Sequence, residues 1–455
     1  MPSLQKNNIR ASDYLVFAAI FLAWCLSFLL VGTPYPYHYD SVNFALAIID
    51  RFDIGIQQPH PPGFLFHAAC AKFVNLFVHQ PFYTQQILNI IYQTSLLILF
   101  LKYIHRNRSV FLVLSLAPLF LFLPAVPLSQ AAGIPFGAAI ALFVYKITRG
   151  NNKHFALVVT FALGIAFRTD LVVYFLPVVL FVHLIYRPTL KQALVSTGAG
   201  ALILLIWYTL TDLLSSGPTL LQATGQAQRM FTSGTSVFFG ASLFEHARSS
   251  LRFIFYYAAV LGPGGLFLLY GYFSGGIARI DLLMFAAATV PLALYGLLVH
   301  IPFAYYFAPV LAFAAVFLPL TFKNSFSGRK AALCVCVNIL FFAFVPKPLY
   351  ESDGKTYTSR SIHQNILKQL RYSGAAGRSE LVHRKNMISS AGQALSGHSS
   401  FSEPEGVLWD RIWYYMGDRV WGKQYLSSDS AEVLLERVPG GWKVHKNDSP
   451  QNTDF

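Results

Sequence analysis

Long apolar runs separated by short polar connections occupy the first three-quarters of this chain. A helix of about 20 apolar residues crosses the roughly 30 Å hydrocarbon core of a bilayer. The pattern predicts an all-α polytopic membrane protein with about eleven transmembrane helices, of which the first acts as an uncleaved signal anchor. The eleven runs cover residues 14–32, 84–103, 110–127, 130–147, 154–167, 170–186, 192–212, 251–273, 280–299, 303–322 and 330–346.

Lysine and arginine are distributed unevenly between alternate connections. If the N-terminus is cytoplasmic, the short outer connections near 128–130, 168–169 and 300–302 contain one basic residue, Arg168. Such an excess on one side is the usual mark of the cytoplasmic side. It predicts a multi-pass protein of the cell (inner) membrane with a cytoplasmic N-terminus. The inner segments hold fourteen basic residues: Lys6, Arg10, Lys102, Arg106, Arg108, Lys146, Arg149, Lys153, Arg187, Lys191, Arg279, Lys323, Arg329 and Lys330.

Composition supports the membrane assignment. The 455 residues are 55% hydrophobic and only 12% charged, with a mean hydropathy of +0.49, whereas soluble domains carry about 25% charged residues. A net charge of +14 is typical of nucleic-acid-binding proteins, but here most of it follows from the membrane topology, so a nucleic-acid partner is excluded. The four cysteines (Cys25, Cys70, Cys334 and Cys336) form neither a disulfide framework nor a zinc-site spacing.

Residues 154–186 are expected to form a hairpin of two short helices. A single helix of this length would be about 50 Å long, and both of its ends are basic. The tip, Arg168-Thr169-Asp170, would then lie recessed below the outer surface. Charged residues at that depth are costly unless they are paired or face a water-filled cavity. Two interpretations remain open: a structural ion pair that closes the hairpin, and an Arg168 that reaches a phosphate.

Two further segments are expected to face outward. The outer loop 33–83 is predicted to contain two amphipathic interfacial helices, one after Asp40 and one over 64–78. In the first, Val42, Ala45, Leu46 and Ile49 form the apolar face, and Ser41, Asn43, Asp50 and Arg51 face water. The outer loop 213–250 is rich in Gly, Ser, Thr and Gln and carries Arg229, Glu245, His246 and Arg248, as in mobile loops that order over a substrate.

The chain becomes polar after residue 346. The expected organisation is a transmembrane catalytic domain over 1–346 and a small extracytoplasmic C-terminal region over 347–455, in which a mixed helical pattern is present.

Reactive side chains concentrate in the first outer loop, in the stretches 35–41 and 57–63. Asp40 lies just beyond the first span, where an extracytoplasmic acceptor can reach a general base. The alternative is an N-cap on the helix that follows. His60, between prolines, is either a binding residue or an exposed turn residue. His38, Asp40 and His60 are also a conceivable divalent-metal site, but their irregular spacing does not support one, and no cofactor is expected.

These motifs together resemble the GT-C superfamily of integral-membrane glycosyltransferases. Asp40, followed by Gln58-Pro59-His60-Pro61-Pro62-Gly63 and an interfacial helix, is similar to the first extracytoplasmic loop of protein O-mannosyltransferases, of aminoarabinose transferases of lipid A and, most closely, of the Rgt-like bacterial branch. Gly164-Ile-Ala-Phe-Arg168-Thr-Asp170 resembles the family's Gly-Leu-x-x-Arg/Lys hairpin. His300-Ile-Pro-Phe-Ala-Tyr305-Tyr306-Phe-Ala-Pro309 resembles its basic-then-Tyr-x-x-Pro entry to a late span.

The resemblance implies an inverting glycosyltransferase. A sugar would move from a polyprenyl-phosphate donor to an extracytoplasmic glycolipid, polysaccharide or protein, with Asp40 as general base. Three departures are present: Ser41 follows Asp40 where mannosyltransferases have an Asp-Glu pair, His60 stands where Lys or Glu is common, and the late-span Arg is absent, with His300 nearest to it. The candidate substrate- and phosphate-binding residues are therefore His38, His60, Arg168, Asp170, Arg229, Arg248, His300 and Tyr305.

A polytopic transporter or flippase of lipid-linked sugars is the alternative function. Such a protein is expected to have ionisable residues or broken helices near the bilayer midplane. In this sequence the polar residues are expected to gather in outer loops and at outer helix ends, which favours the enzyme.

Overall fold

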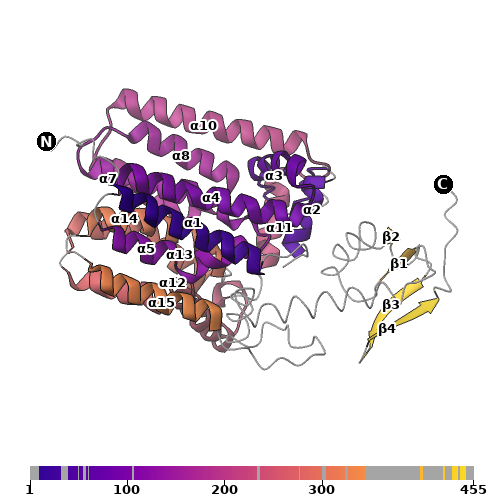
Figure 1. Cartoon of the computed structure of the whole chain (residues 1–455). Coiled ribbons are helices and arrows are strands. Elements are labelled where there is room, and N and C mark those ends of the chain that lie inside the picture. The colour runs from indigo at the N-terminus through magenta and orange to yellow at the C-terminus, as the bar shows by residue number, and fades with distance from the viewer. Residues whose placement is uncertain are drawn as a thin grey trace.

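The helical part of the chain is a bundle whose long helices run roughly alongside one another (Figure 1). The structure is a computed structural model that describes residues 10–31, 39–49, 51–54, 58–59, 61–104, 107–232, 236–275, 277–299, 304–322, 326–344, 400–402, 424–425, 433–438 and 441–446. Statements below concern these residues.

Each predicted apolar run coincides with helix. Five described helices are long and apolar enough to cross a membrane, or seven if each of two bent pairs counts as one span. The count of eleven spans stays a prediction. The helices of the bundle are α1 (Ala11–Val31), α4 (Pro81–Tyr103), α5 (Arg108–Ser115), α6 (Pro118–Phe122), α7 (Ile134–Thr148), α8 (His154–Phe167), α9 (Leu171–Ile185), α10 (Leu190–Leu213), α12 (Leu243–Ser274), α13 (Arg279–Leu298), α14 (Ala308–Thr321) and α15 (Gly328–Phe344).

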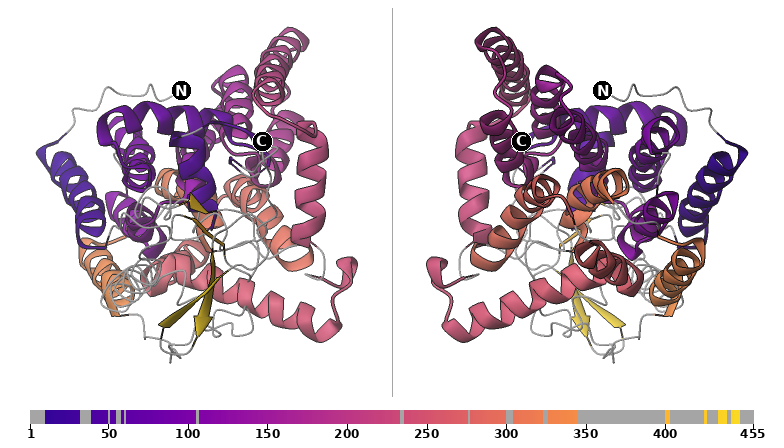
Figure 2. Two further views of the ribbon diagram at one scale, coloured as in Figure 1. Left: turned by 90° about the vertical axis from the view of Figure 1, so that its right-hand side faces the viewer. Right: turned by 90° about the vertical axis from the view of Figure 1, so that its left-hand side faces the viewer.

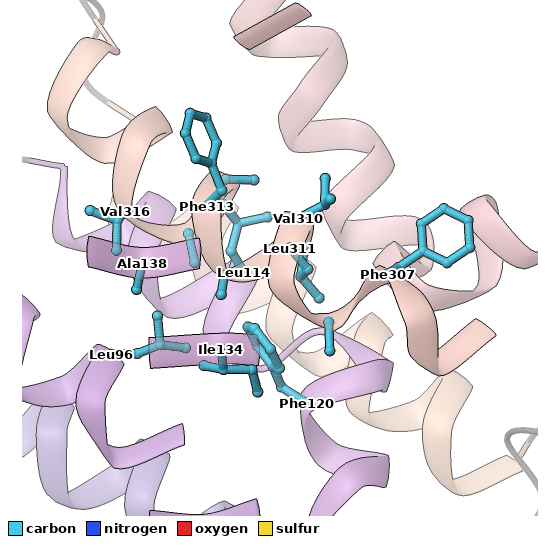
Figure 3. Packing of buried hydrophobic residues seen from close by; sticks show 14 of the residues in the cluster. Leu96, Leu114, Phe120, Ile134, Ala138, Phe307, Val310, Leu311, Phe313 and Val316 are labelled. Atoms are coloured by element: carbon cyan, nitrogen blue, oxygen red, sulfur yellow. The ribbon is translucent and has the colours of Figure 1, made fainter. Parts of the chain in front are cut away.

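Helix α14 forms the centre of the bundle. All of its residues except Leu320 are buried. It packs against α7, where Gly137 leaves room for the backbone of Pro309: a Cβ on this glycine would lie 2.2 Å from the Pro309 carbonyl oxygen. Figure 3 shows Phe313 and Val316 of α14 near Ala138 of α7. The close backbone approach buries apolar side chains all round one helix, which explains its uninterrupted hydrophobic sequence.

The run 110–127, expected as one helix, is broken. Helices α5 and α6, with the 3₁₀ turn η2 (Leu123–Ala125), bend by 52°. A break frees backbone carbonyl groups, which are costly to leave unpaired in an apolar environment. Side chains of neighbouring helices satisfy them: Trp24 Nε1 donates to the Ser115 carbonyl oxygen, Asn89 Nδ2 to that of Leu123, and Gln93 Nε2 to that of Phe120. Asn89 and Gln93 are thus polar residues inside the predicted span 84–103, in addition to those expected in outer loops and at outer helix ends.

Helix α12 is also irregular. It bends by 40° between Phe255 and Tyr257. A separate irregularity follows at Gly262, which has a non-helical φ of 67° and precedes Pro263. Only glycine adopts this backbone without strain, and a Cβ there would lie 2.6 Å from Asn338 Oδ1. The same Asn338 oxygen accepts the Gly264 N–H at 2.9 Å. Neutral amide side chains thus pair with backbone groups at the α5–α6 break and beside the Gly262 irregularity of α12.

Three shorter helices lie at one end of the bundle: α2 (Tyr39–Ile49), α3 (Leu65–Val78) and α11 (Leu220–Thr232) (Figure 1). Helix α3 is amphipathic in an inverted sense, since His67 is buried and Phe73, Leu76 and Phe77 are exposed. This pattern suits a helix lying in the membrane interface. The prediction that Ser41 and Asn43 of α2 face water is wrong. Both are fully buried, because α2 packs between α3 and α4 and the Ser41 carbonyl accepts Gln85 Nε2.

The connections are grouped at the two ends of the bundle as the alternation predicts. Contacts of Arg168 bring together residues 64, 129 and 168 from predicted outer connections and residue 306 from the outer end of the predicted span 303–322. Ion pairs Arg108–Asp13 and Arg149–Asp281 join predicted inner segments. Which end faces the cytoplasm stays a prediction from the lysine and arginine distribution.

The described part of the C-terminal region is a small sheet with the strand order β2-β1-β3-β4. Its strands are β1 (Ser400–Ser402), β2 (Gln424–Tyr425), β3 (Val433–Val438) and β4 (Gly441–Lys446), and β3 and β4 are antiparallel with Val438 opposite Gly441. Most of residues 347–455, where the sequence analysis expects a mixed helical pattern, lies outside the described residues. The Pro439-Gly440 dipeptide between two alternating runs is a turn pattern that favours a hairpin.

Candidate active site

The tip of the α8–α9 hairpin carries a buried ion pair. Helix α8 ends at Phe167 and α9 begins at Leu171, so Arg168 and Asp170 flank the turn. Arg168 donates to the Asp170 carboxylate twice, from Nε at 3.1 Å and from Nη2 at 2.8 Å. This bidentate geometry is the strong form of an arginine–carboxylate contact. The hairpin and its paired tip agree with the sequence analysis.

The guanidinium is almost completely enclosed. Arg168 is 1% exposed, and its Nη1 donates to Ser129 Oγ at 2.8 Å from η3 (Ser129–Gly133). The Asp170 carboxylate also accepts the Tyr174 hydroxyl at 3.3 Å. Arginine has five N–H donors, and these contacts use three of them. Burial of a charge at this level needs both a counter-ion and hydrogen bonds, and the site provides both.

Aromatic rings lie against the guanidinium. The Phe64 ring centroid is 4.5 Å from the Arg168 Cζ atom, and that of Tyr306 is 5.6 Å away. Tyr305, one of the candidate residues, stacks on Tyr306 with centroids 5.4 Å apart. Cation–π contacts of this kind contribute about 2 kcal/mol when desolvated. The first outer loop, the hairpin and the start of the late span therefore meet at Arg168.

A chain of rings links this cluster to helix α2. Phe44 stacks on Phe64, with centroids 5.7 Å apart, and meets the edge of His67 at 5.3 Å. His67 Nδ1 lies 3.1 Å from the Tyr92 hydroxyl oxygen. Burial, together with the charge of Arg168, lowers the pKa of His67 to about 3, so the imidazole is neutral. Asp40 lies in the first turn of α2, one helical turn before Phe44.

The proline-rich turn directs Phe64 into the cluster. Gly63 has φ of 93°, and a Cβ there would lie 2.7 Å from the Ile54 side chain. Phe64 itself is left-handed, with φ of 44°, which is uncommon for a bulky residue. Upstream, Asp53 and Gln58 exchange two backbone hydrogen bonds of 2.6 and 2.7 Å. The glycine is thus required by the fold of the loop that presents Phe64.

The remaining candidate residues fall into two groups. His38, His60, His300 and the side chain of Asp40 lie outside the described residues. Arg229 is exposed on α11, and Arg248 is half-buried on α12. No described contact joins either arginine to the Arg168 cluster. In the described part of the chain, no group of three His, Cys, Asp or Glu residues has the geometry of a metal site.

Sequence reasoning missed the partners of Arg168. Ser129, Phe64 and Tyr306 are 39, 104 and 138 residues away from it in the chain. Tyr306 is adjacent to Tyr305 in the motif already identified, and Phe64 follows directly on the Pro-Pro-Gly turn. The position of Phe64 and Tyr306 directly beside a recognised motif could have pointed to them, whereas nothing in the sequence around Ser129 does so.

Comparison with known proteins identifies the fold. A scan against family models and a search of curated proteins gave no match. Among solved structures, the chain is similar to ArnT from Cupriavidus metallidurans in the apo state, with a TM-score of 0.59 and 11% identity, over 91% of this chain and 84% of that one. The chain therefore shares the fold of ArnT, in agreement with the fold that the resemblance to GT-C enzymes implies, and it is a multi-pass membrane protein.

Proposed function

We propose that this protein is an inverting membrane glycosyltransferase that moves a sugar from a polyprenyl-phosphate donor to an extracytoplasmic glycolipid, polysaccharide or protein. The observation that carries the proposal is the buried Arg168 cluster, which joins three distant segments at one end of a fold shared with ArnT. A buried, fully supported cation at a helix-hairpin tip suits recognition of a phosphate.

Arg168 acts as an oriented hydrogen-bond donor in this proposal. Asp170 and Ser129 hold the guanidinium plane through three of its N–H groups, which leaves the other two in a fixed direction. Because Asp170 neutralises much of its charge, Arg168 alone would bind a phosphate diester weakly. Arg229, Arg248 and His300 in the outer loops are the candidates that complete phosphate binding once donor is present.

An apolar groove is available for the isoprenoid tail. It has a volume of about 340 Å³ and lies between α9 and α13. Its lining includes Pro177, Phe181, Val290 and Pro291, and every lining residue is apolar. Pro177 is seven residues along α9 from Asp170, or about 10 Å at 1.5 Å per residue. A lipid whose phosphate lies near Arg168 can therefore place its tail along the same helix.

Asp40 is the proposed general base. The acceptor hydroxyl oxygen attacks the anomeric carbon, the bond from that carbon to the phosphate oxygen breaks, and the hydroxyl proton passes to the Asp40 carboxylate. Polyprenyl phosphate leaves as the anion, and the configuration at the anomeric carbon inverts. The ring chain Phe44–Phe64–Arg168 connects the helix of the base to the phosphate-binding residue, so the two groups are positioned by one packed unit.

A transporter or flippase of lipid-linked sugars is the second candidate. The broken helices α5–α6 and α12 favour it, since discontinuous helices form substrate sites in many transporters. However, neutral side chains pair with the backbone at the α5–α6 break and beside Gly262. The buried cation Arg168 lies at the end of the bundle and not at either of these positions.

The deciding experiment is sugar transfer from extracted polyprenyl-phosphate sugars in proteoliposomes. Wild type should transfer, and Asp40→Asn should lose transfer while remaining folded, because the amide keeps the size of the side chain but accepts no proton. Asp50→Asn, the same change at the other end of the α2 region, is the matched control. Equal transfer by the Asp40→Asn protein would refute the base assignment, and movement of intact donor across the bilayer without transfer would support the transporter.

A further inference from the structure

A partly polar pocket, separate from the apolar groove between α9 and α13, lies beside α3. Its volume is about 580 Å³. One wall is a face of α3 with Leu65, Ala69 and Lys72, and the opposite wall is the end of α10 with Leu213 and Leu214. Phe64 and His67, which serve the Arg168 cluster, lie on a different face of the α3 region. We call this space the headgroup pocket.

Cations outnumber carboxylates among the described residues that line the headgroup pocket. Arg51 and Lys72 line it together with one carboxylate, that of Asp53. The Asp53 carboxylate accepts hydrogen bonds from Ser216, from its N–H at 2.9 Å and its hydroxyl at 2.6 Å. Arg51 Nη2 lies 3.4 Å from the same carboxylate, but the arginine side chain is 62% exposed. The lining residues that the structure describes thus carry two cations and one anion, and the pocket opens to the outside.

The surroundings of the headgroup pocket face lipid. Only 11% of the most apolar stretch of α10 is buried in the protein, and Leu213 at the pocket edge is 75% exposed. On α3, Phe73, Leu76 and Phe77 are exposed, and they follow the lining residues Ala69 and Lys72 by about one helical turn. Large apolar side chains in this arrangement are expected to lie among acyl chains. An occupant must therefore combine an anionic head with an apolar tail.

We propose that the headgroup pocket binds the phosphate headgroup of an acidic glycerophospholipid of the surrounding leaflet. Arg51 and Lys72 contact the phosphate, and the acyl chains lie over Leu213 and the exposed apolar face of α3. This site is distinct from the donor site at Arg168, because different faces of α3 line the two.

Lipid in this pocket would order the loop that leads to the catalytic cluster. Asp53 connects the pocket wall to Ser216, and through its backbone to Gln58. Gln58 begins the proline-rich turn that ends at Gly63 and Phe64. Lipid binding therefore stabilises the segment that presents Phe64 to Arg168, which links the lipid composition of the membrane to the geometry of the candidate active site.

The test is thermal unfolding of the detergent-solubilised full chain titrated with palmitoyl-oleoyl phosphatidylglycerol. Wild type should be stabilised, and the half-saturating lipid concentration should be about tenfold higher for Arg51→Gln/Lys72→Gln. Ala69→Trp, which fills the pocket but keeps both charges, should show the same loss. The double variant Arg187→Gln/Lys191→Gln at the other end of α10 is the matched control and should titrate as wild type.

Two results would overturn the proposal. One is an unchanged phosphatidylglycerol titration in both Arg51→Gln/Lys72→Gln and Ala69→Trp. The other is equal stabilisation by inorganic phosphate or by phosphatidylcholine at the same concentrations, which would mean that a free anion or an uncharged lipid suffices. The assay reads lipid binding and not transfer, so its outcome is independent of the glycosyltransferase assignment.

Discussion

Two arginines near α3, Arg168 and Arg51, have opposite environments: one is buried and the other is exposed. Arg168 is 1% exposed and bound by Asp170, Ser129 and two aromatic rings. Arg51, in the headgroup pocket, is 62% exposed, and its contact with Asp53 is longer, at 3.4 Å. The first cation has exchanged water for fixed protein partners, whereas the second keeps most of its water.

This difference determines what each arginine can do. A buried ion pair is costly to break, since removing one partner leaves the other charge without water or counter-ion. It therefore holds a group in one direction, as a catalytic site requires. An exposed pair contributes little to folding, but its cation can move to meet a ligand. The two sites should respond very differently to the same substitution.

Removing the buried cation should have the largest effect. Arg168→Gln is expected to lower the free energy of unfolding by about 3–5 kcal/mol, because Asp170 loses its counter-ion. Arg168→Gln/Asp170→Asn should regain most of that stability, but neither protein should transfer sugar. Chemical denaturation and the proteoliposome assay measure the two quantities.

The ion pair Arg149–Asp281 at the other end of the bundle provides the matched control. Its Arg149 Nη2 donates to both Asp281 carboxylate oxygens, at 3.1 and 2.9 Å, and Arg149→Gln/Asp281→Asn should retain transfer. If the folded Arg168→Gln/Asp170→Asn protein transferred sugar at the wild-type rate, the hairpin pair would be purely structural.

Shortening the aromatic support of Arg168 should have the next largest effect. Phe64→Ala is expected to cost about 3 kcal/mol, because it removes a buried ring from between Arg168 and Phe44. Phe64→Leu keeps most of the volume and should cost about 1–2 kcal/mol through the lost cation–π contact. Thermal unfolding of both variants, with the exposed Phe73→Leu as control, measures this. Equal costs for Phe73→Leu and Phe64→Leu would argue against a role of the ring at Arg168.

Loosening the contact between the headgroup pocket and the proline-rich loop should have a smaller effect than the substitutions at Arg168 and Phe64. Ser216→Ala removes the hydroxyl that donates to Asp53 at 2.6 Å and should cost about 1–2 kcal/mol locally. Faster amide hydrogen exchange at Asp53 and Gln58 is the expected observation, because their paired backbone groups open more often. Ser274→Ala on the exposed end of α12 is the control. Unchanged exchange at Gln58 would mean that Ser216 does not support the loop.

The exposed cation should matter least for folding. Arg51→Gln is expected to change the free energy of unfolding by no more than about 0.5 kcal/mol without lipid. The same variant should bind phosphatidylglycerol less tightly, as a separate titration shows. A large loss of stability in the absence of lipid would remove the contrast between the two arginines.

Much of the helical architecture could be predicted from the sequence. The apolar runs coincide with helices, and the 154–186 hairpin with Arg168 and Asp170 at its tip follows from length and charge alone. The breaks at residues 115–118 and at Gly262 could not be predicted in the same way. Whether a broken helix is stable depends on donors such as Asn89 and Gln93 in another helix, and hydropathy does not reveal which side chain meets which carbonyl.

Part of the candidate site was also predictable from the sequence, namely the residues that belong to recognisable local motifs. Arg168, Asp170 and Tyr305 were recognised, and the structure places them in one cluster. The burial of Ser41 and Asn43 was not foreseen, since an amphipathic pattern assumes that one face of a helix meets water, whereas α2 is covered by both α3 and α4.

The sequence by itself determined where the chain is helical and apolar, because hydrophobic periodicity and helix length are local properties. Only the tertiary structure decided that Arg168 lies between Phe64 and Tyr306 while Arg51 stays exposed. The sequence placed Arg168 at a recessed hairpin tip and Arg51 on a water-facing helix side, but it did not identify the two rings and the hydroxyl that enclose Arg168. Burial depends on contacts between segments more than 100 residues apart, and those contacts exist only when the bundle is assembled.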